Sequence, residues 1–213
     1  ITRGSPLAPY INMPKGMGGY IEFTGPRKPT YIYSLRFERG KGSEHSPEIG
    51  WKNSSRGFIK FMPAENLSFS MLYQHTDEKN WLNWLNDNLL ATFHRKQRKS
   101  VFELEWFKDN KHELRIKAQL VAFTGRNPIP YLGDQKGNLE PIDLNISPIT
   151  ISELAFQVRY RYEIMPLSYL YLVYSKGGRV TLNDDEDNLA SLYRRPWNDP
   201  EKENFTLKLR YRF

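Results

Sequence analysis

The last nine residues of the chain alternate strictly between apolar and polar side chains. The apolar residues occupy every second position: Phe205, Leu207, Leu209, Tyr211 and Phe213. Three of the four positions between them are basic: Lys208, Arg210 and Arg212. A repeat of two residues is typical of a β-strand with one apolar face and one polar face.

A strand of this kind is what the wall of an outer-membrane β-barrel requires, because its outer face meets lipid and its inner face meets water. The aromatic residue at its end is similar to the carboxy-terminal signal by which bacterial barrels are recognised for insertion. We therefore expect an insertion signal at Phe205, Leu207, Leu209, Tyr211 and Phe213. The working hypothesis is a membrane β-barrel or a piece of one.

Composition agrees with a barrel and excludes a helical membrane protein. Hydrophobic residues make up 39% of the chain and the mean hydropathy is −0.66, and no apolar run approaches the roughly 18 residues that a membrane helix needs. The 13 Tyr, 12 Phe and 5 Trp would suit the aromatic girdles of a barrel. They would also suit a soluble carbohydrate-binding β-sandwich, which stays open as the alternative.

Alternating segments predict nine strands in one domain of 213 residues. The expected strands are 17–24, 30–38, 56–62, 67–74, 90–107, 112–124, 149–164, 169–175 and 205–213. An entry loop is expected at 1–16, short turns at 25–29, 63–66, 109–111 and 165–168, and long loops at 39–55, 75–89, 125–148 and 176–204. Within the loop 75–89, Trp81, Trp84 and Leu85 have the spacing of a short helix, either covering its own surface or forming a binding platform.

Short turns and long loops follow one another in strict alternation, as in barrels with periplasmic turns and extracellular loops. This order predicts an all-β, antiparallel up-and-down transmembrane barrel with the long loops outside the cell and the carboxy terminus in the periplasm. Bacterial single-chain barrels have an even number of strands. We therefore expect either a tenth strand within residues 1–8 or a larger barrel of which this is the carboxy-terminal part.

Charged residues fall on the polar side of the predicted strands. We expect the following to face the lumen: Arg36, Glu38, Lys60, Glu103, Glu105, Arg115, Lys117, Arg159, Arg161, Glu163, Lys208, Arg210 and Arg212. With a net charge of +7, such a lumen would mildly favour anions. A soluble sheet with these cations would suggest nucleic acid, but no second layer is predicted to cover its apolar face, so no nucleic-acid partner is expected. The cations between His94 and Lys99 fit best beyond the hydrocarbon.

No catalytic or metal-binding constellation emerges from the sequence. The chain has no Cys, and its four His lack metal-ligand spacing. The acidic run 184–187 lacks the glycine and the later glutamate of a calcium loop, so a solvated loop is expected there. Glu103 and Glu105 share a strand face and could pass for a glycosidase pair, but neutralisation of lumen cations is the expected role. We predict no enzyme activity, cofactor or metal.

Three segments and the aromatic end resemble the carboxy-terminal barrel of a poorly characterised bacterial outer-membrane family. The segments are 2–7 (TRGSPL), 62–68 (MPAENLS) and 165–174 (MPLSYLYLVY). Members of this family pair an amino-terminal carbohydrate-binding-like domain with a large barrel of unknown function. The resemblance implies that the chain is a fragment and supplies no catalytic residues.

Two roles remain open for such a barrel: passage of a polar solute, with saccharide as a candidate, or service as a barrel subunit of an outer-membrane complex. The expected partners are outer-membrane lipid, the barrel-assembly machinery during insertion, and other outer-membrane or periplasmic subunits. An open charged lumen would favour transport. A lumen plugged by the loop 176–204 would favour a scaffold.

Overall fold

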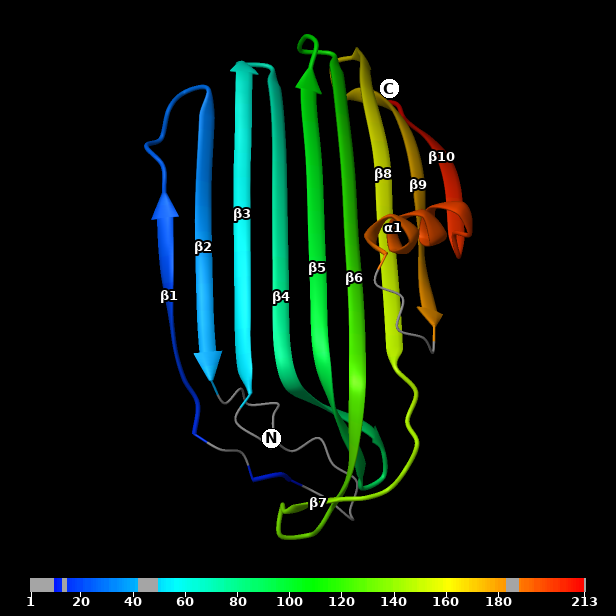
Figure 1. Ribbon diagram of the computed structural model, residues 1–213. Coiled ribbons are helices and arrows are strands. Elements are labelled where there is room, and N and C mark those ends of the chain that lie inside the picture. Colours follow the sequence, from blue (N-terminus) through cyan, green and yellow to red (C-terminus); the bar gives the residue numbers. More distant parts are fainter. Residues whose placement is uncertain (1–9, 13–14, 42–49, 183–187, 213) are drawn as a thin grey trace.

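The computed structural model describes residues 10–12, 15–41, 50–182 and 188–212. It is an all-β protein built on a single ten-stranded antiparallel sheet (Figure 1). The strands are β1 (Met17–Thr24), β2 (Tyr31–Lys41), β3 (Trp51–Ala64), β4 (Leu67–Asn86), β5 (Leu89–Phe107), β6 (His112–Gly133), β7 (Leu139–Pro141), β8 (Ile149–Met165), β9 (Ser168–Leu182) and β10 (Lys202–Arg210). A helix, α1 (Leu189–Asn198), lies between β9 and β10 in the chain.

The strands follow one another in space in the order of the sequence, which confirms the predicted up-and-down arrangement. The order is β1-β2-β3-β4-β5-β6-β8-β9-β10, and short β7 pairs with the distal end of β6. The sheet is not closed, and β1 and β10 form its two edges. The predicted strands all exist, and the segment 205–213 corresponds to β10, which begins three residues earlier; Phe213 lies outside the described residues.

The long loops are shorter than the sequence predicted, because strands extend into all four of their predicted ranges. Most of 75–89 belongs to β4 and β5, so the helix expected around Trp81 is wrong and the two strands meet at a tight turn. Strands also extend into 39–55, 125–148 and 176–204, and α1 occupies part of the last of these. The described residues of the entry segment, 10–12 and 15–16, are neither helix nor strand, as expected. The tenth strand expected within residues 1–8 lies outside the described residues, and the additional strand of the sheet is β7.

The long hairpin of β4 and β5 continues past a bend. Pairing shifts between Glu78 and Trp81 on β4 and between Thr92 and His94 on β5, and Asn80 and Asn127 have positive φ at the same level. Such bulges change strand direction and increase local twist. Strands β4 and β5 therefore curve together beyond this level (Figure 1).

A small apolar core stabilises the bent tip. Leu90 is fully buried and packs with Leu82 and Ile11, and Leu139 of β7 packs against the same cluster. The backbone N–H of Asn12 donates to the carbonyl of Gly137 at 2.8 Å. The far ends of β4, β5 and β6 therefore form a packed extension with β7 and residues 11–12. We call this end of the sheet the long-loop end and the opposite end the short-turn end.

The short turns have distinct local causes. In the turn after β8, Pro166 supplies a fixed φ and Leu167 adopts φ 67°, a conformation in which glycine is the usual residue. In the turn after β5, the carboxylate of Asp109 accepts the backbone N–H groups of Lys111 and His112 at 2.8 and 2.9 Å. These bonds match the side-chain-to-backbone closure typical of Asp in turns.

The Asp109 turn predicts a pH dependence. The backbone hydrogen bond from Lys111, together with that from His112 and nearby positive charge, lowers the pKa of Asp109 below its usual 3.8. A lowered pKa in the folded state stabilises the fold above the unfolded-state value, and this contribution is lost as pH falls through the folded value. Asp109→Asn keeps an acceptor oxygen and removes the titration, so we expect it to flatten the acid limb of the unfolding curve below about pH 4. Chemical denaturation of both proteins across this pH range is the measurement, and identical acid limbs would contradict the assignment.

Candidate functional site

The two faces of the sheet differ in chemistry, and the strand register defines them. Residues that pair directly across strands project to the same face. Met71 pairs with Phe102 and Ile59, whereas its neighbour Ser70 pairs with Glu103 and Lys60. We call the face of Met71 the apolar face and the face of Ser70 the charged face.

An apolar band covers the apolar face at the short-turn end. It contains Tyr31, Tyr33, Leu35 and Phe37 of β2, Ile59 and Phe61 of β3, Phe69, Met71 and Tyr73 of β4, and Phe102, Leu104 and Trp106 of β5. Ile21 of β1 pairs with Phe37 and extends the band to the edge strand. On the first four strands the side chains of the band are widely exposed: Ile21 is 77% exposed, Phe37 60% and Met71 51%. On β10, Phe205, Leu207 and Leu209 each exceed 59%. Exposed apolar patches of this extent are rare on soluble monomers.

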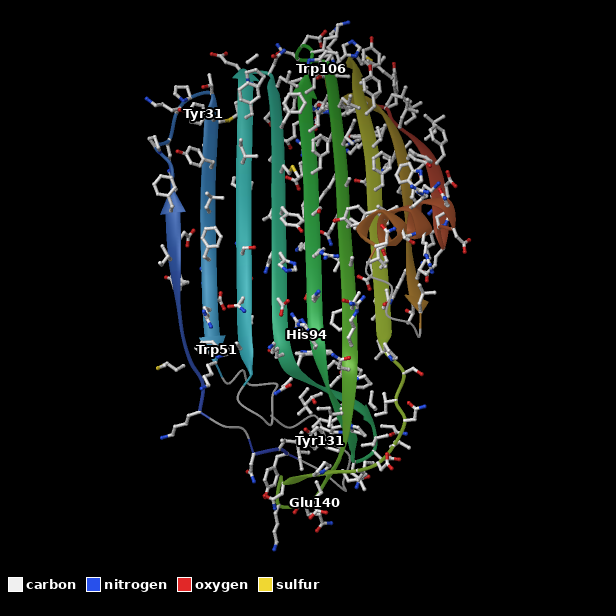
Figure 2. All side chains as sticks on the ribbon, viewed as in Figure 1. Tyr31, Trp51, His94, Trp106, Tyr131 and Glu140 are labelled. Carbon is white, nitrogen blue, oxygen red and sulfur yellow. The ribbon has the colours of Figure 1, made fainter. Side chains whose placement is uncertain are left out.

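The length of the apolar band matches a membrane. On β4 it runs from Leu67 to Tyr73, about 20 Å at roughly 3.3 Å per residue, and on β8 from Leu154 to Tyr162, about 26 Å. The hydrophobic belt of a transmembrane barrel is about 25 Å tall. Large aromatic residues occur at both borders: Figure 2 shows Tyr31 and Trp106 at the short-turn end and Trp51 near the opposite ends of β2 and β3.

Helix α1 covers part of the apolar face, over β8 and β9. The ring of Trp197 packs edge-on against Phe156 with centroids 5.3 Å apart, Leu192 is buried, and its carbonyl accepts the hydroxyl of Ser152. Tyr193 reaches across β6 to Ser100 of β5, with the two hydroxyl oxygens 3.2 Å apart. The helical part of the predicted loop 176–204 therefore packs on the apolar face.

The charged face gathers the residues that the sequence singled out. Register places twelve of the thirteen predicted lumen residues on this one face: Arg36, Glu38, Lys60, Glu103, Glu105, Arg115, Lys117, Arg159, Arg161, Glu163, Lys208 and Arg210. The thirteenth, Arg212, follows the end of β10, and its backbone N–H donates to the hydroxyl of Ser168 at 3.0 Å. The predicted alternation is confirmed as a common face.

Ion pairs between neighbouring strands connect this face. Lys117 and Glu103 are 2.7 Å apart, Lys52 and Glu38 3.4 Å, Arg36 and Glu22 3.6 Å, Arg115 and Glu105 3.7 Å, and Arg179 and Glu153 3.5 Å. Glu103 and Glu105 each have a cationic partner, as expected for residues that neutralise cations on neighbouring strands. Most of these pairs are about a third to a half exposed, and such pairs contribute little stability individually.

The charged face also carries two buried carboxylates that were not among the residues predicted from the sequence. Glu113 is 4% exposed. One of its carboxylate oxygens contacts the Nε of Arg115, and the other lies 2.8 Å from the Nη2 of Arg161. Glu78 is 3% exposed, and one of its oxygens lies 3.6 Å from Arg95. Extending the two-residue alternation of β6 back by one step would have placed Glu113 beside Arg115. Glu78 could not be found because its segment was assigned to a loop.

A groove on the charged face near β10 could hold a polar solute. It has a volume of about 630 Å³, and its charged-face lining includes Lys117, Gln119, Gln157, Ser175 and Asn204. Amides, hydroxyls and a cation are groups that bind hydroxyl-rich or anionic ligands. Glu153, Arg179 and Lys202 also line the groove, which therefore presents polar side chains and charges of both signs on the same face as the ion pairs.

Other candidate chemistry finds no support in the described residues. Among them, no three His, Asp or Glu side chains converge in a way that would hold a metal ion. His94 instead pairs with Asp77 at 2.9 Å. The acidic run 184–187 lies outside the described residues. Within the described part of the chain, α1 is too short and too polar to cross a membrane, and no other helix meets that requirement either.

No protein-family model matches the chain, and comparison with curated proteins and with solved structures finds no significant similarity. The resemblance to a bacterial outer-membrane family therefore remains a hypothesis.

Proposed function

We propose that the chain forms a wall segment of an outer-membrane β-barrel, with the apolar face against lipid and the charged face toward an aqueous lumen that passes a polar solute. The observation that carries this proposal is the exposed apolar band, bounded by aromatic residues, on one face of an up-and-down sheet. A lipid-facing barrel wall requires this arrangement.

The distribution of charge supports the same orientation. A cation or a carboxylate at the membrane midplane costs several kcal/mol on the lipid face but is tolerated in a watery lumen. At the level of the apolar band the ion pairs lie on the opposite, charged face of the sheet, as Lys117 and Glu103 do. A soluble sandwich would need a second layer over the apolar band, and among the described residues the cover is α1, over β6, β8 and β9.

The placement of α1 favours passage over a plugged scaffold. Helix α1, the part of the segment 176–204 that packs onto the sheet, lies on the side we assign to lipid. The groove lined by Gln119, Gln157 and Asn204 then opens toward the lumen. Saccharide is a candidate solute because amide and hydroxyl groups line this groove.

Conductance of the full-length protein in a planar bilayer tests this proposal. We expect discrete channels with a modest preference for anions, because Arg159, Arg161 and Lys208 lie on the charged face and nearby charge concentrates counter-ions. Replacing Arg159 and Lys208 with Glu should lower or reverse the ratio of anion to cation permeability.

The matched control is Arg194→Glu on α1, because this exposed arginine is attached to the opposite face and should leave the permeability ratio unchanged. Absence of any channel from correctly inserted protein would contradict transport and favour a subunit role. Monodisperse behaviour without detergent would contradict the membrane assignment itself and favour a soluble carbohydrate-binding protein.

A further inference from the structure

We propose that the apolar face also carries a binding surface for the phosphate-bearing headgroups of anionic lipids, at the border of the apolar band toward the long-loop end. This inference rests on the proposed function, because it requires the apolar band to lie in lipid. The surface, called here the basic belt, consists of Arg39, Lys41, Lys96, Arg98, Arg126 and Arg194.

The basic belt begins where the apolar band ends. On β5 the apolar face carries Trp106, Leu104 and Phe102, then Ser100, and then Arg98 and Lys96. Arg39 of β2 occupies the same register row as Lys96. The change from apolar to basic over two or three positions is the pattern expected where hydrocarbon gives way to headgroups.

Helix α1 lies at the same border. Its Tyr193 contacts Ser100, the last position before Arg98, while Leu192 is buried against the sheet and Arg194 is exposed. A short amphipathic helix with buried apolar residues and outward arginines is typical of a segment lying in a membrane interface. Helix α1 therefore adds a cation to the basic belt at the level where headgroups would lie.

Aromatic contacts near β2 agree with an interfacial position. The guanidinium of Arg39 lies 4.3 Å from the ring centroid of Trp51, and the amine of Lys41 lies 5.6 Å from it. Tryptophan prefers the membrane interface, where its ring is partly apolar and partly hydrated. Arginine in turn recognises phosphate oxygens with two donors at once.

The charge balance of this border makes it attractive to anions. The register row of Lys96 holds two basic side chains, Arg39 and Lys96, and one acidic side chain, Asp77. A basic surface could equally hold nucleic acid, but this one shares a face with the apolar band and continues it directly. The lipid headgroup is therefore the occupant that the geometry favours.

Tryptophan quenching by brominated phospholipids tests the inference in the full-length protein. Vesicles would contain brominated phosphatidylcholine or brominated phosphatidylglycerol, each diluted into unlabelled phosphatidylcholine. We expect the anionic lipid to associate with the protein at least about twofold more strongly at low salt, since a Lys or Arg near an anionic surface favours it by a few fold, and this preference should fall with added salt.

The variant Lys96→Gln with Arg98→Gln should remove most of this preference. The matched control is Arg56→Gln with Lys99→Gln, which removes the same charge from the register row next to that of Arg98, on the charged face, and should keep the preference. Arg194→Gln, an exposed change on α1, should weaken it partially, which keeps the test decisive if the double variant fails to fold.

Three results would overturn the inference: equal quenching by both brominated lipids, equal loss in the control, or displacement of the anionic lipid by free phosphate or a short DNA duplex at matched ionic strength. The last result would reassign the basic belt to soluble anions or to nucleic acid. Absence of quenching by either lipid would show that the protein does not insert, which would overturn the proposed function and the inference with it.

Discussion

Replacing Glu113 with Gln is expected to lower the free energy of unfolding by about 2 to 3 kcal/mol. Glu113 is 4% exposed and contacts both Arg115 and Arg161. Removing one partner of a buried ion pair typically costs about 3–5 kcal/mol. The two arginines are a third to a half exposed and can recover hydration, so we place the effect at the lower end.

The matched control is Glu105→Gln. Glu105 lies 3.7 Å from the same Arg115, but its side chain is 40% exposed, so we expect a loss of less than about 1 kcal/mol. Denaturant unfolding in detergent micelles would compare the two variants. Equal losses would show that burial of Glu113 does not contribute to stability.

Placing a lysine in the apolar band should have the other large effect. Met71→Lys is expected to destabilise the inserted protein by about 2 to 4 kcal/mol, the cost of a cation on the lipid face near the midplane. Leu72→Lys, one residue further along β4, puts the same charge on the charged face and should cost less than about 1 kcal/mol.

Folding equilibria in lipid vesicles would measure both lysine variants. In a lipid-free soluble protein Met71→Lys would not be the more destabilising of the two variants. Met71 is 51% exposed, and exposed substitutions usually change stability by less than about 0.5 kcal/mol. A neutral Met71→Lys in vesicles would therefore contradict the assignment of the apolar face to lipid.

The strands and short turns could be predicted because their signals are local. Segment 17–24 coincides with β1, and the turn after β8 lies at Pro166, where proline fixes the chain. The turn predicted at 63–66 is confined to Glu65 and Asn66, because Pro63 and Ala64 belong to β3. Unbroken alternation also determines which charged residues share a face, since one step along a strand changes the face. The twelve residues of the charged face follow from this rule alone.

The long-loop end could not be predicted, because its structure depends on contacts distant in sequence. Trp81, Trp84 and Leu85 have helical spacing, but β4 bends at Asn80 and continues as a strand packed on Leu90 and Ile11. Helix α1 was missed because Pro196 within it argues against a helix. A weak signal was present in the sequence: Leu192 and Pro196 are four residues apart, a spacing that places two side chains on one face of a helix. In the structure both side chains are buried.

The same dependence on contacts distant in sequence explains why the basic belt could not be predicted from the sequence. The basic belt combines residues of β2, β5, β6 and α1, which are far apart in sequence. The segment 94–99 alone suggested a position beyond the hydrocarbon. Its association with Arg39 and Arg194 required the register of the sheet and the placement of α1.

A spin-label scan along β4 tests the central claim most directly, and the absence of Cys from the sequence allows single cysteines to be introduced without other changes. Labels at Phe69, Met71 and Tyr73 should collide mainly with oxygen dissolved in lipid, and labels at Ser70, Leu72 and Gln74 mainly with a water-soluble nickel complex. A strict two-residue alternation between the two relaxants is the predicted result for the protein in vesicles. Equal access of the nickel complex to both sets would contradict the assignment of the apolar face to lipid.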